Sequence, residues 1–298
     1  MTTIGTILRD KREELDLSQE DVCEGICSVS TLSRIENGNQ NPSQKTLMAL
    51  LGKLKLTLQI FPQYILPHEV EINELERQIS DLIDTRQYKK AEQHLQKLEK
   101  IKLIEPLTQR YMLLCRAIIG SHTGDTPEES LKKMREITLA IAEDFNPKKI
   151  LRHLLTKDDL SIISHLGVAY ERTGDTDTAM EIYQGVVDYV EHKVSDKEAI
   201  SPVYTLALYC LSRLFGLAED YEEELRLASI GIENAIKWGR LRNLPLLLTN
   251  KGCALVELKR KEEGATTLQE AYYLFRTLGQ LDKCDLIQDY AQKNDLKI

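Results

Sequence analysis

Two short stretches near the start of the chain, LSQEDV at residues 17–22 and LSRIENG at residues 32–38, decide the fold of the amino-terminal part. Ser18 is followed three residues later by Asp21, the spacing of a capping box at the start of a helix. Asn37-Gly38 ends the second stretch with residues that favour a left-handed helix terminus. The pattern predicts two short helices joined by a tight turn.

The flanking sequence adds one helix on each side of this pair. Apolar residues repeat at helical spacing over residues 4–15, and again after Ser43, which is placed to cap a fourth helix. Two short helices joined by a tight turn, the second exposing small polar residues, have the geometry that enters a DNA major groove. Residues 1–66, called the head below, are therefore predicted to form a helix-turn-helix domain.

These motifs resemble the helix-turn-helix domain of the phage-repressor type, the Cro/C1 or XRE class. The stretch ICSVSTLSRIE at residues 26–36 further resembles peptide-sensing regulators of the PlcR and Rgg kind. Position by position, the resemblance implies DNA contacts by Gln19, Ser28, Val29, Ser30, Thr31, Ser33 and Arg34. It also implies an ion pair between Arg12 and Glu36 that joins the first helix to the third.

The chemistry of these residues suits DNA. Hydroxyl groups can donate to or accept from base edges, Val29 can contact a thymine methyl, and Arg34 can pair with guanine or a phosphate. Two alternatives stay open at this point. Ser28 could serve only as a helix cap, and Arg34 could contact only the DNA backbone.

The charge balance limits how the protein can bind DNA. The chain of 298 residues carries a net charge of −8, and the head, with seven basic and eight acidic residues, is nearly neutral. Phosphate contacts dominate affinity for DNA, so a single head should bind weakly. We therefore expect a homodimer that presents two heads to double-stranded DNA.

The remainder, residues 67–298, is predicted to be an all-α array of tetratricopeptide-like repeats, called the repeat domain below. Residues 56–70 change character, and Pro62 and Pro67 bracket a short connection within them that marks the boundary. Further on, Gly174-Asp175 and Ala179 show the spacing of such a repeat, with a small residue where two helices cross. Five helical hairpins and a capping helix near residues 281–294 are expected, with crossing positions at residues 91, 130, 179, 224 and 264.

Such arrays form a curved sheet of helices with a concave inner face. The repeat offsets place a mixture of polar, aromatic and charged residues on this face, which suits an extended peptide with backbone groups to satisfy. The predicted peptide-binding residues are Glu171, Tyr209, Arg213, Thr249, Asn250 and Cys253. The same offsets also select Cys115, Ile119, His122, Ser164, Val168 and Val256. Asn250 and Arg213 could instead satisfy neighbouring helices.

Other classes of function find little support. The sequence has no phosphate-binding glycine loop, zinc-protease pair or nucleophile elbow, so we expect no enzyme, cofactor or catalytic residue. The six cysteines lack metal or redox spacing and are interpreted as small reduced hydrophobes. No apolar run approaches the length of a membrane span, and no signal segment begins the chain, so we expect a cytoplasmic protein.

In architecture the whole chain resembles the quorum-sensing regulators of the Rap, NprR, PlcR, PrgX and Rgg group. The resemblance implies a dimeric transcription factor whose repeat domain binds a short signalling peptide and couples it to DNA recognition. Two alternatives remain. The repeat domain could dock a protein partner instead of a peptide, or the chain could be a Rap-like module that acts on a signalling protein.

Overall fold

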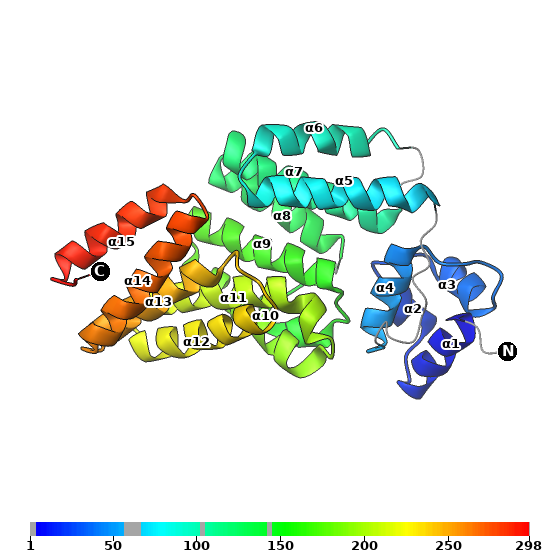
Figure 1. Cartoon of the computed structure of the whole chain (residues 1–298). Coiled ribbons are helices and arrows are strands. Elements are labelled where there is room, and N and C mark those ends of the chain that lie inside the picture. The colour runs from blue at the N-terminus through cyan, green and yellow to red at the C-terminus, as the bar shows by residue number, and fades with distance from the viewer. Residues whose placement is uncertain (1–3, 57–66, 102–104, 142–144, 298) are drawn as a thin grey trace. The chain divides into compact units, whose positions relative to one another are not determined.

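The computed structural model describes residues 4–56, 67–101, 105–141 and 145–297. Its helices divide into two compact units, residues 1–179 with 193–196, and residues 180–192 with 197–298. Within the described ranges the regular elements are all helices (Figure 1), which confirms the predicted all-α class. The predicted boundary after residue 66 falls at the end of the segment 57–66, outside the described residues.

The described part of the head, residues 4–56, contains four helices at the positions that the sequence predicts. They are α1 (Ile4–Glu14), α2 (Gln19–Cys23), α3 (Val29–Glu36) and α4 (Gln44–Lys53). Ser18 forms the expected capping box with Asp21, and Ser28 and Ser43 cap the two helices that follow. The apolar residues that face inward form one buried cluster, which includes Leu8, Val22, Leu32, Ile35 and Leu50.

The rest of the first unit is built from helices that pack against their neighbours in sequence, α5 on α6, α6 on α7, α7 on α8 and α8 on α9. Their bounds are α5 (Pro67–Asp84), α6 (Tyr88–Leu98), α7 (Pro106–Thr123), α8 (Pro127–Leu139), the 3-10 helix η2 (Pro147–Arg152) and α9 (Lys157–Thr173). Gly174 ends α9 in the left-handed conformation, with φ of 86°, as the repeat motif requires.

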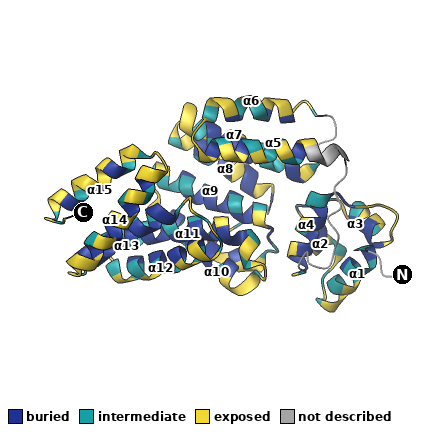
Figure 2. Ribbon diagram, in the orientation of Figure 1, coloured by how far each residue is buried: buried dark blue, intermediate teal, exposed yellow. Residues whose placement is uncertain are grey.

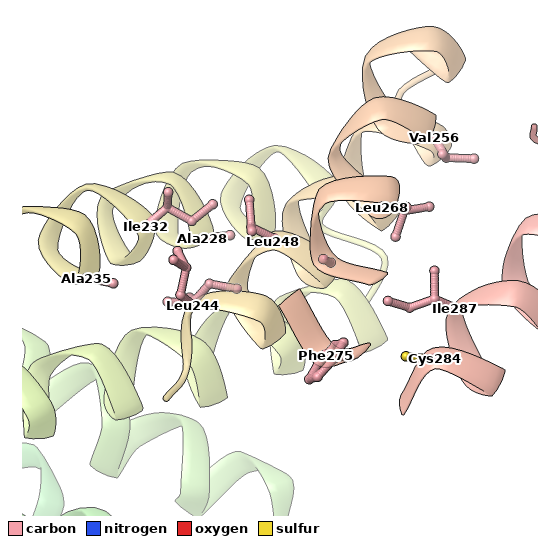
Figure 3. Packing of buried hydrophobic residues seen from close by; sticks show 12 residues of the cluster. Ala228, Ile232, Ala235, Leu244, Leu248, Val256, Leu268, Phe275, Cys284 and Ile287 are labelled. Carbon is pink, nitrogen blue, oxygen red and sulfur yellow. The ribbon is translucent and has the colours of Figure 1, made fainter. Parts of the chain in front are cut away.

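The second unit holds most of α10 (Thr176–Lys193), then α11 (Lys197–Leu217), α12 (Tyr221–Lys237), α13 (Leu244–Glu257), α14 (Lys261–Thr277) and α15 (Leu281–Lys293). Figure 3 shows the apolar core that α12, α13, α14 and α15 share, with Leu248, Leu268, Phe275 and Ile287 among its members. Among the described helices of this unit, α11 packs on α12, α13 on α14 and α14 on α15. The division of the repeat domain into five hairpins and a capping helix stays a prediction.

The predicted crossing positions are all buried, at Ala91, Ser130, Ala179, Glu224 and Gly264. At Gly264 an added Cβ would lie 2.6 Å from Val256 Cγ2 and 2.9 Å from the Gly252 carbonyl oxygen. At Glu224 the small residue stands on the partner helix instead, because a Cβ on Gly216 would lie 2.5 Å from the Glu224 carboxyl group. Close helix approach therefore needs one small residue at the crossing, on either helix.

Only α11, among the described helices, is long and apolar enough to cross a membrane. In Figure 2 much of the α11 ribbon has the dark blue of buried residues, and 56% of the most apolar window of this helix is buried inside the protein. Its apolar residues therefore belong to the core of the second unit.

Candidate functional site

The third helix presents the surface that could read DNA. Val29, Ser30 and Arg34 are exposed, whereas Leu32 and Ile35 are buried under the opposite face. Thr31 and Ser33 are half-buried at the edges of this surface. The structure thus brings five of the seven predicted DNA-contact residues together on one short helix.

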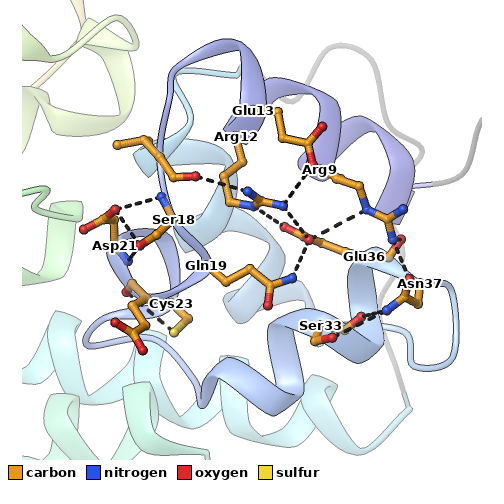
Figure 4. A network of polar contacts seen from close by, with 12 residues as sticks. Arg9, Arg12, Glu13, Ser18, Gln19, Asp21, Cys23, Ser33, Glu36 and Asn37 are labelled. Carbon is orange, nitrogen blue, oxygen red and sulfur yellow. Dashed lines mark hydrogen bonds and ion pairs between the residues drawn. The ribbon is translucent and has the colours of Figure 1, made fainter.

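A buried ion pair holds this helix in place, as the sequence predicts (Figure 4). Arg12 Nε donates to Glu36 Oε1 at 2.7 Å and Arg12 Nη2 donates to Oε2 at 3.0 Å, a two-pronged contact between α1 and α3. The Glu36 side chain is 1% exposed. Burial alone would raise the pKa of Glu36, but the hydrogen bonds from Arg12 and Gln19 hold it below its usual value.

The other two predicted DNA contacts also have roles inside the head. Gln19 Nε2 donates to Glu36 Oε2 at 2.7 Å, which leaves one amide hydrogen of Gln19 for DNA. Ser28 accepts from the Thr31 backbone N–H and shares hydrogen bonds with the hydroxyls of Ser30 and Thr31, each at 2.8 Å. Ser28 therefore caps α3, and its contact with DNA stays a prediction.

Sequence reasoning missed the polar contacts between the head and the repeat domain. Arg110 of α7 donates to the carbonyl oxygen of Gly25 and pairs with Asp159 of α9 at 2.8 Å. Lys45 of α4 pairs with Glu76 of α5 at 2.7 Å. The partners are separated by 31 to 85 residues along the chain, so no local sequence pattern predicts these contacts. The capping box that Thr156 forms with Asp159 is local, and it places Asp159 in the first turn of α9.

In the second unit the structure gathers most of the predicted peptide-binding residues on two helices in contact, α11 and α13. Tyr209 and Arg213 lie one turn apart on α11, and Thr249, Asn250 and Cys253 lie on α13. All except Asn250 are half-buried, and Tyr209 and Cys253 pack against the same apolar cluster. Burial lowers the pKa of Arg213 and raises that of the Cys253 thiol to about 12.

Asn250 requires a correction. Its side chain is buried, and Nδ2 donates to the Tyr209 carbonyl oxygen at 3.1 Å and to Ser212 Oγ at 2.8 Å. Both amide hydrogens are thus used in joining α13 to α11, and only the amide oxygen remains for a peptide. Asn250 therefore satisfies a neighbouring helix, the alternative that the sequence left open for it. A contact of its amide oxygen with a peptide stays a prediction.

The same offsets misplaced four more residues. Cys115, Ile119, Ser164 and Val256 are buried in the helix packing, with exposed fractions of 0–4%, because consecutive helix pairs bury both flanks of the inner helix. Glu171 is half-buried on α9, in the first unit. Among the described residues no cluster of His, Cys, Asp and Glu could hold a metal ion.

The fold and these surfaces define a class of protein, a helix-turn-helix domain joined to an α-helical repeat domain. Residues 8–61 match the helix-turn-helix family, and residues 76–288 match the RNPP family C-terminal domain. The second match covers more than half of the chain, so the chain belongs to the RNPP family, whose members are transcriptional regulators. No curated protein sequence matches the chain.

Two solved structures share the fold over nearly the whole chain. PlcR of Bacillus thuringiensis, in complex with the peptide PapR7 and DNA, is 17% identical with a TM-score of 0.60, over 95% of this chain and 98% of PlcR. ComR of S. thermophilus, in complex with DNA and its signalling peptide ComS, is 18% identical with a TM-score of 0.56, over 99% of this chain and 100% of ComR.

Proposed function

We propose that this protein is a homodimeric, cytoplasmic transcriptional regulator without catalytic activity, in which residues 1–66 bind DNA and residues 67–298 bind a short linear peptide. The exposed face of α3, with Val29, Ser30 and Arg34 above the buried Arg12–Glu36 pair, is the observation that carries it. Membership of the RNPP family supports it, as do PlcR and ComR, whose structures hold both DNA and a peptide.

The predicted mechanism couples the two ligands through the dimer. A peptide that binds one arrangement of the dimer more tightly shifts the population toward it, and so changes the spacing of the two heads. We expect an inverted repeat in the DNA with half-sites about one helical turn, or a multiple of it, apart. Each head brings few positive charges, so both half-sites are needed for stable binding.

Footprinting of the DNA upstream of the protein's own gene and its neighbours tests the DNA-binding part. A protected inverted repeat is expected, and Arg34→Ala should weaken binding by roughly 1–3 kcal/mol if Arg34 contacts a guanine. The absence of any protected site with the folded dimer would refute specific binding in these regions.

Calorimetry tests the peptide-binding part, with synthetic peptides encoded by short open reading frames beside the gene. Arg213 can bind a carboxylate of the peptide through two parallel hydrogen bonds, so Arg213→Gln should weaken binding roughly tenfold or more. The matched control is Arg226→Gln on α12, because Arg226 is 54% exposed and already paired with Glu223. Equal loss in both variants would remove Arg213 from the site.

A further inference from the structure

A pocket of about 360 Å³ with a mixed polar and apolar lining lies within the first unit, between residues of α4, α5, α7 and α9. Its volume is at the lower end of the range of small-ligand sites, roughly 300–1,000 Å³. The residues that matter below are Lys45 of α4, Glu76 of α5, Leu107, Tyr111 and Leu114 of α7, and Lys157 of α9. The head therefore contributes one wall of this pocket, through Lys45.

The Lys45 ammonium group occupies a well-defined position at this pocket. It lies 2.7 Å from Glu76 Oε1, 3.4 Å from Thr108 Oγ1 and 5.2 Å from the centre of the Tyr111 ring. The Tyr111 hydroxyl is held by Ser80 at 2.8 Å and donates to the Glu76 carbonyl oxygen at 2.7 Å. A carboxylate, a hydroxyl and an aromatic face around one cation are the groups that recognise an ammonium ion.

The charges around the pocket explain why this position needs a cation. Arg77 is paired with Glu74 and Asp81, and Arg110 is paired with Asp159. Lys157 and Asp158 of α9 also line the pocket. The acid in contact with Lys45 is Glu76, whose side chain is 16% exposed. If Lys45 left, this mostly buried carboxylate would lose its ion-pair partner, which is unfavourable unless another cation takes the place.

We propose that the Glu76–Thr108–Tyr111 cluster is a receptor for the primary amine of a small ligand, with Lys45 as its internal occupant. The ligand class is an amino-terminal residue with an apolar side chain, which Leu107 and Leu114 can contact. Such an amine makes the same contacts as Lys45 and competes with it for the cluster. Naming a peptide as the natural source of this amine rests on the proposed function; the amine site itself does not.

Competition at this cluster has a consequence for the head. Lys45 lies in the first turn of α4, which shares the head's core with the DNA-facing helix α3. A ligand amine that displaces Lys45 removes one of the polar contacts between the head and the repeat domain. Occupancy of the pocket thereby weakens the attachment of α4 without any contact between ligand and DNA-facing residues.

The test uses leucinamide, a primary amine with an apolar side chain and no carboxylate, and N-acetyl-leucinamide, which lacks the amine. Calorimetry compares wild type with Lys45→Met, which keeps the apolar stem of the side chain but vacates the site. If Lys45 occupies the cluster about nine-tenths of the time, leucinamide should bind Lys45→Met roughly tenfold more tightly. Adding Glu76→Gln to Lys45→Met should abolish this gain.

Lys11→Met is the matched control. Lys11 also forms an ion pair at 2.7 Å, with Glu14, but it belongs to α1 and does not line the pocket. It should bind leucinamide as wild type does. Equal binding of the two probes to Lys45→Met, or no gain over wild type in that variant, overturns the proposal. A thermal melt of each variant establishes that the protein under test is folded.

A second measurement needs no substitution and covers the case in which Lys45→Met does not fold. Hydrogen exchange of the α4 amides in wild type should become faster with saturating leucinamide and stay unchanged with the acetylated probe. Unchanged exchange with both probes counts against displacement of Lys45. Neither experiment contains DNA or involves α11 and α13, so failure here leaves the proposed function standing, and failure of DNA binding leaves the amine site standing.

Discussion

The head and the second unit each bury one glutamate, and the two are stabilised in opposite ways. Glu36 of α3 is 2% exposed and receives hydrogen bonds from Arg12 and Gln19, which keep its pKa below the usual value despite burial. Glu224 of α12 is 5% exposed, and burial, together with nearby Glu257, raises its pKa to about 8. Burial alone therefore does not decide whether a carboxyl group is charged; the partner does.

The difference follows from what each position has to do. In the head, a charged pair with defined geometry joins α1 to α3 beside the apolar core. In the second unit the apolar core already fixes α11 and α12, and Glu224 fills the space above Gly216. Glu36 joins two helices as an anion. Glu224 fills a helix crossing and is largely protonated near neutral pH.

The largest effect is expected when the charged pair is broken. Arg12→Ala leaves Glu36 buried beside a half-exposed Arg9, whose Nε is 3.8 Å from Glu36 Oε2. Removing one partner of a buried pair costs roughly 3–5 kcal/mol, so the head should lose most of its stability. Hydrogen exchange of α1 and α3 amides would detect this directly.

The control is Lys11→Ala, which breaks an ion pair that includes a 66% exposed glutamate. Exposed pairs of this kind contribute at most about 1 kcal/mol, so the head should stay folded. If Arg12→Ala keeps normal exchange in α1 and α3 but loses DNA binding, Arg12 contacts DNA and the structural role assigned to it fails.

Glu224→Gln should stabilise the protein at pH 8, whereas Arg12→Ala should destabilise it. The folded-state pKa of about 8 exceeds the ordinary value of 4.5, so the folded protein binds a proton that the unfolded chain releases between these values. Wild type therefore loses stability as the pH rises from about 4.5 to 8. The glutamine variant mimics the protonated acid and should be more stable at pH 8 by roughly 2–3 kcal/mol.

Denaturant unfolding of the two proteins at pH 5 and pH 8 measures this difference. The curves should converge at pH 5, where Glu224 is protonated in the folded state. A constant difference at both values would mean that Glu224 does not titrate between them. For Glu36 the sign is reversed, because its folded-state pKa is lowered: its contribution is present above about pH 4.5 and is lost as the pH falls further.

A smaller effect is expected at the glycine beneath Glu224. Gly216→Ala places a methyl group 2.5 Å from the Glu224 carboxyl carbon, and the flexible end of that side chain must move. Overpacking of this kind should cost roughly 1–2 kcal/mol at pH 6. Gly52→Ala near the end of α4, where nothing lies within 4 Å, is the control and should cost nothing. A melt in which both variants match wild type would show that the crossing is loose.

Local chemistry explains how much the sequence could predict. The caps at Ser18 and Ser43 depend on residues within one turn, and the helical pairs depend on spacing that repeats along the chain, so both were predictable. The Arg12–Glu36 pair came from the resemblance of the motif. The hydrogen-bond partner of Asn250 could not be predicted, because the choice between a peptide and the Tyr209 carbonyl depends on how α11 and α13 face one another. The Lys45–Glu76 pair depends on contact across two domains.

The smallest effect is expected at Gln19, which donates a hydrogen bond to Glu36 and is also one of the proposed DNA contacts. Its bond to Glu36 Oε2 at 2.7 Å is charge-assisted, but Arg12 keeps two bonds to the same carboxylate, so Gln19→Ala should cost only about 1 kcal/mol. If its second amide hydrogen contacts a phosphate, as proposed, DNA affinity should fall roughly fivefold. Glu20→Ala, at the exposed neighbouring position, should leave stability within about 0.5 kcal/mol of wild type. Thermal melts and DNA titrations at fixed salt separate the two roles. If Gln19→Ala loses stability but keeps full DNA affinity, Gln19 acts only through its bond to Glu36. If the stability of Gln19→Ala is unchanged, Gln19 does not stabilise Glu36.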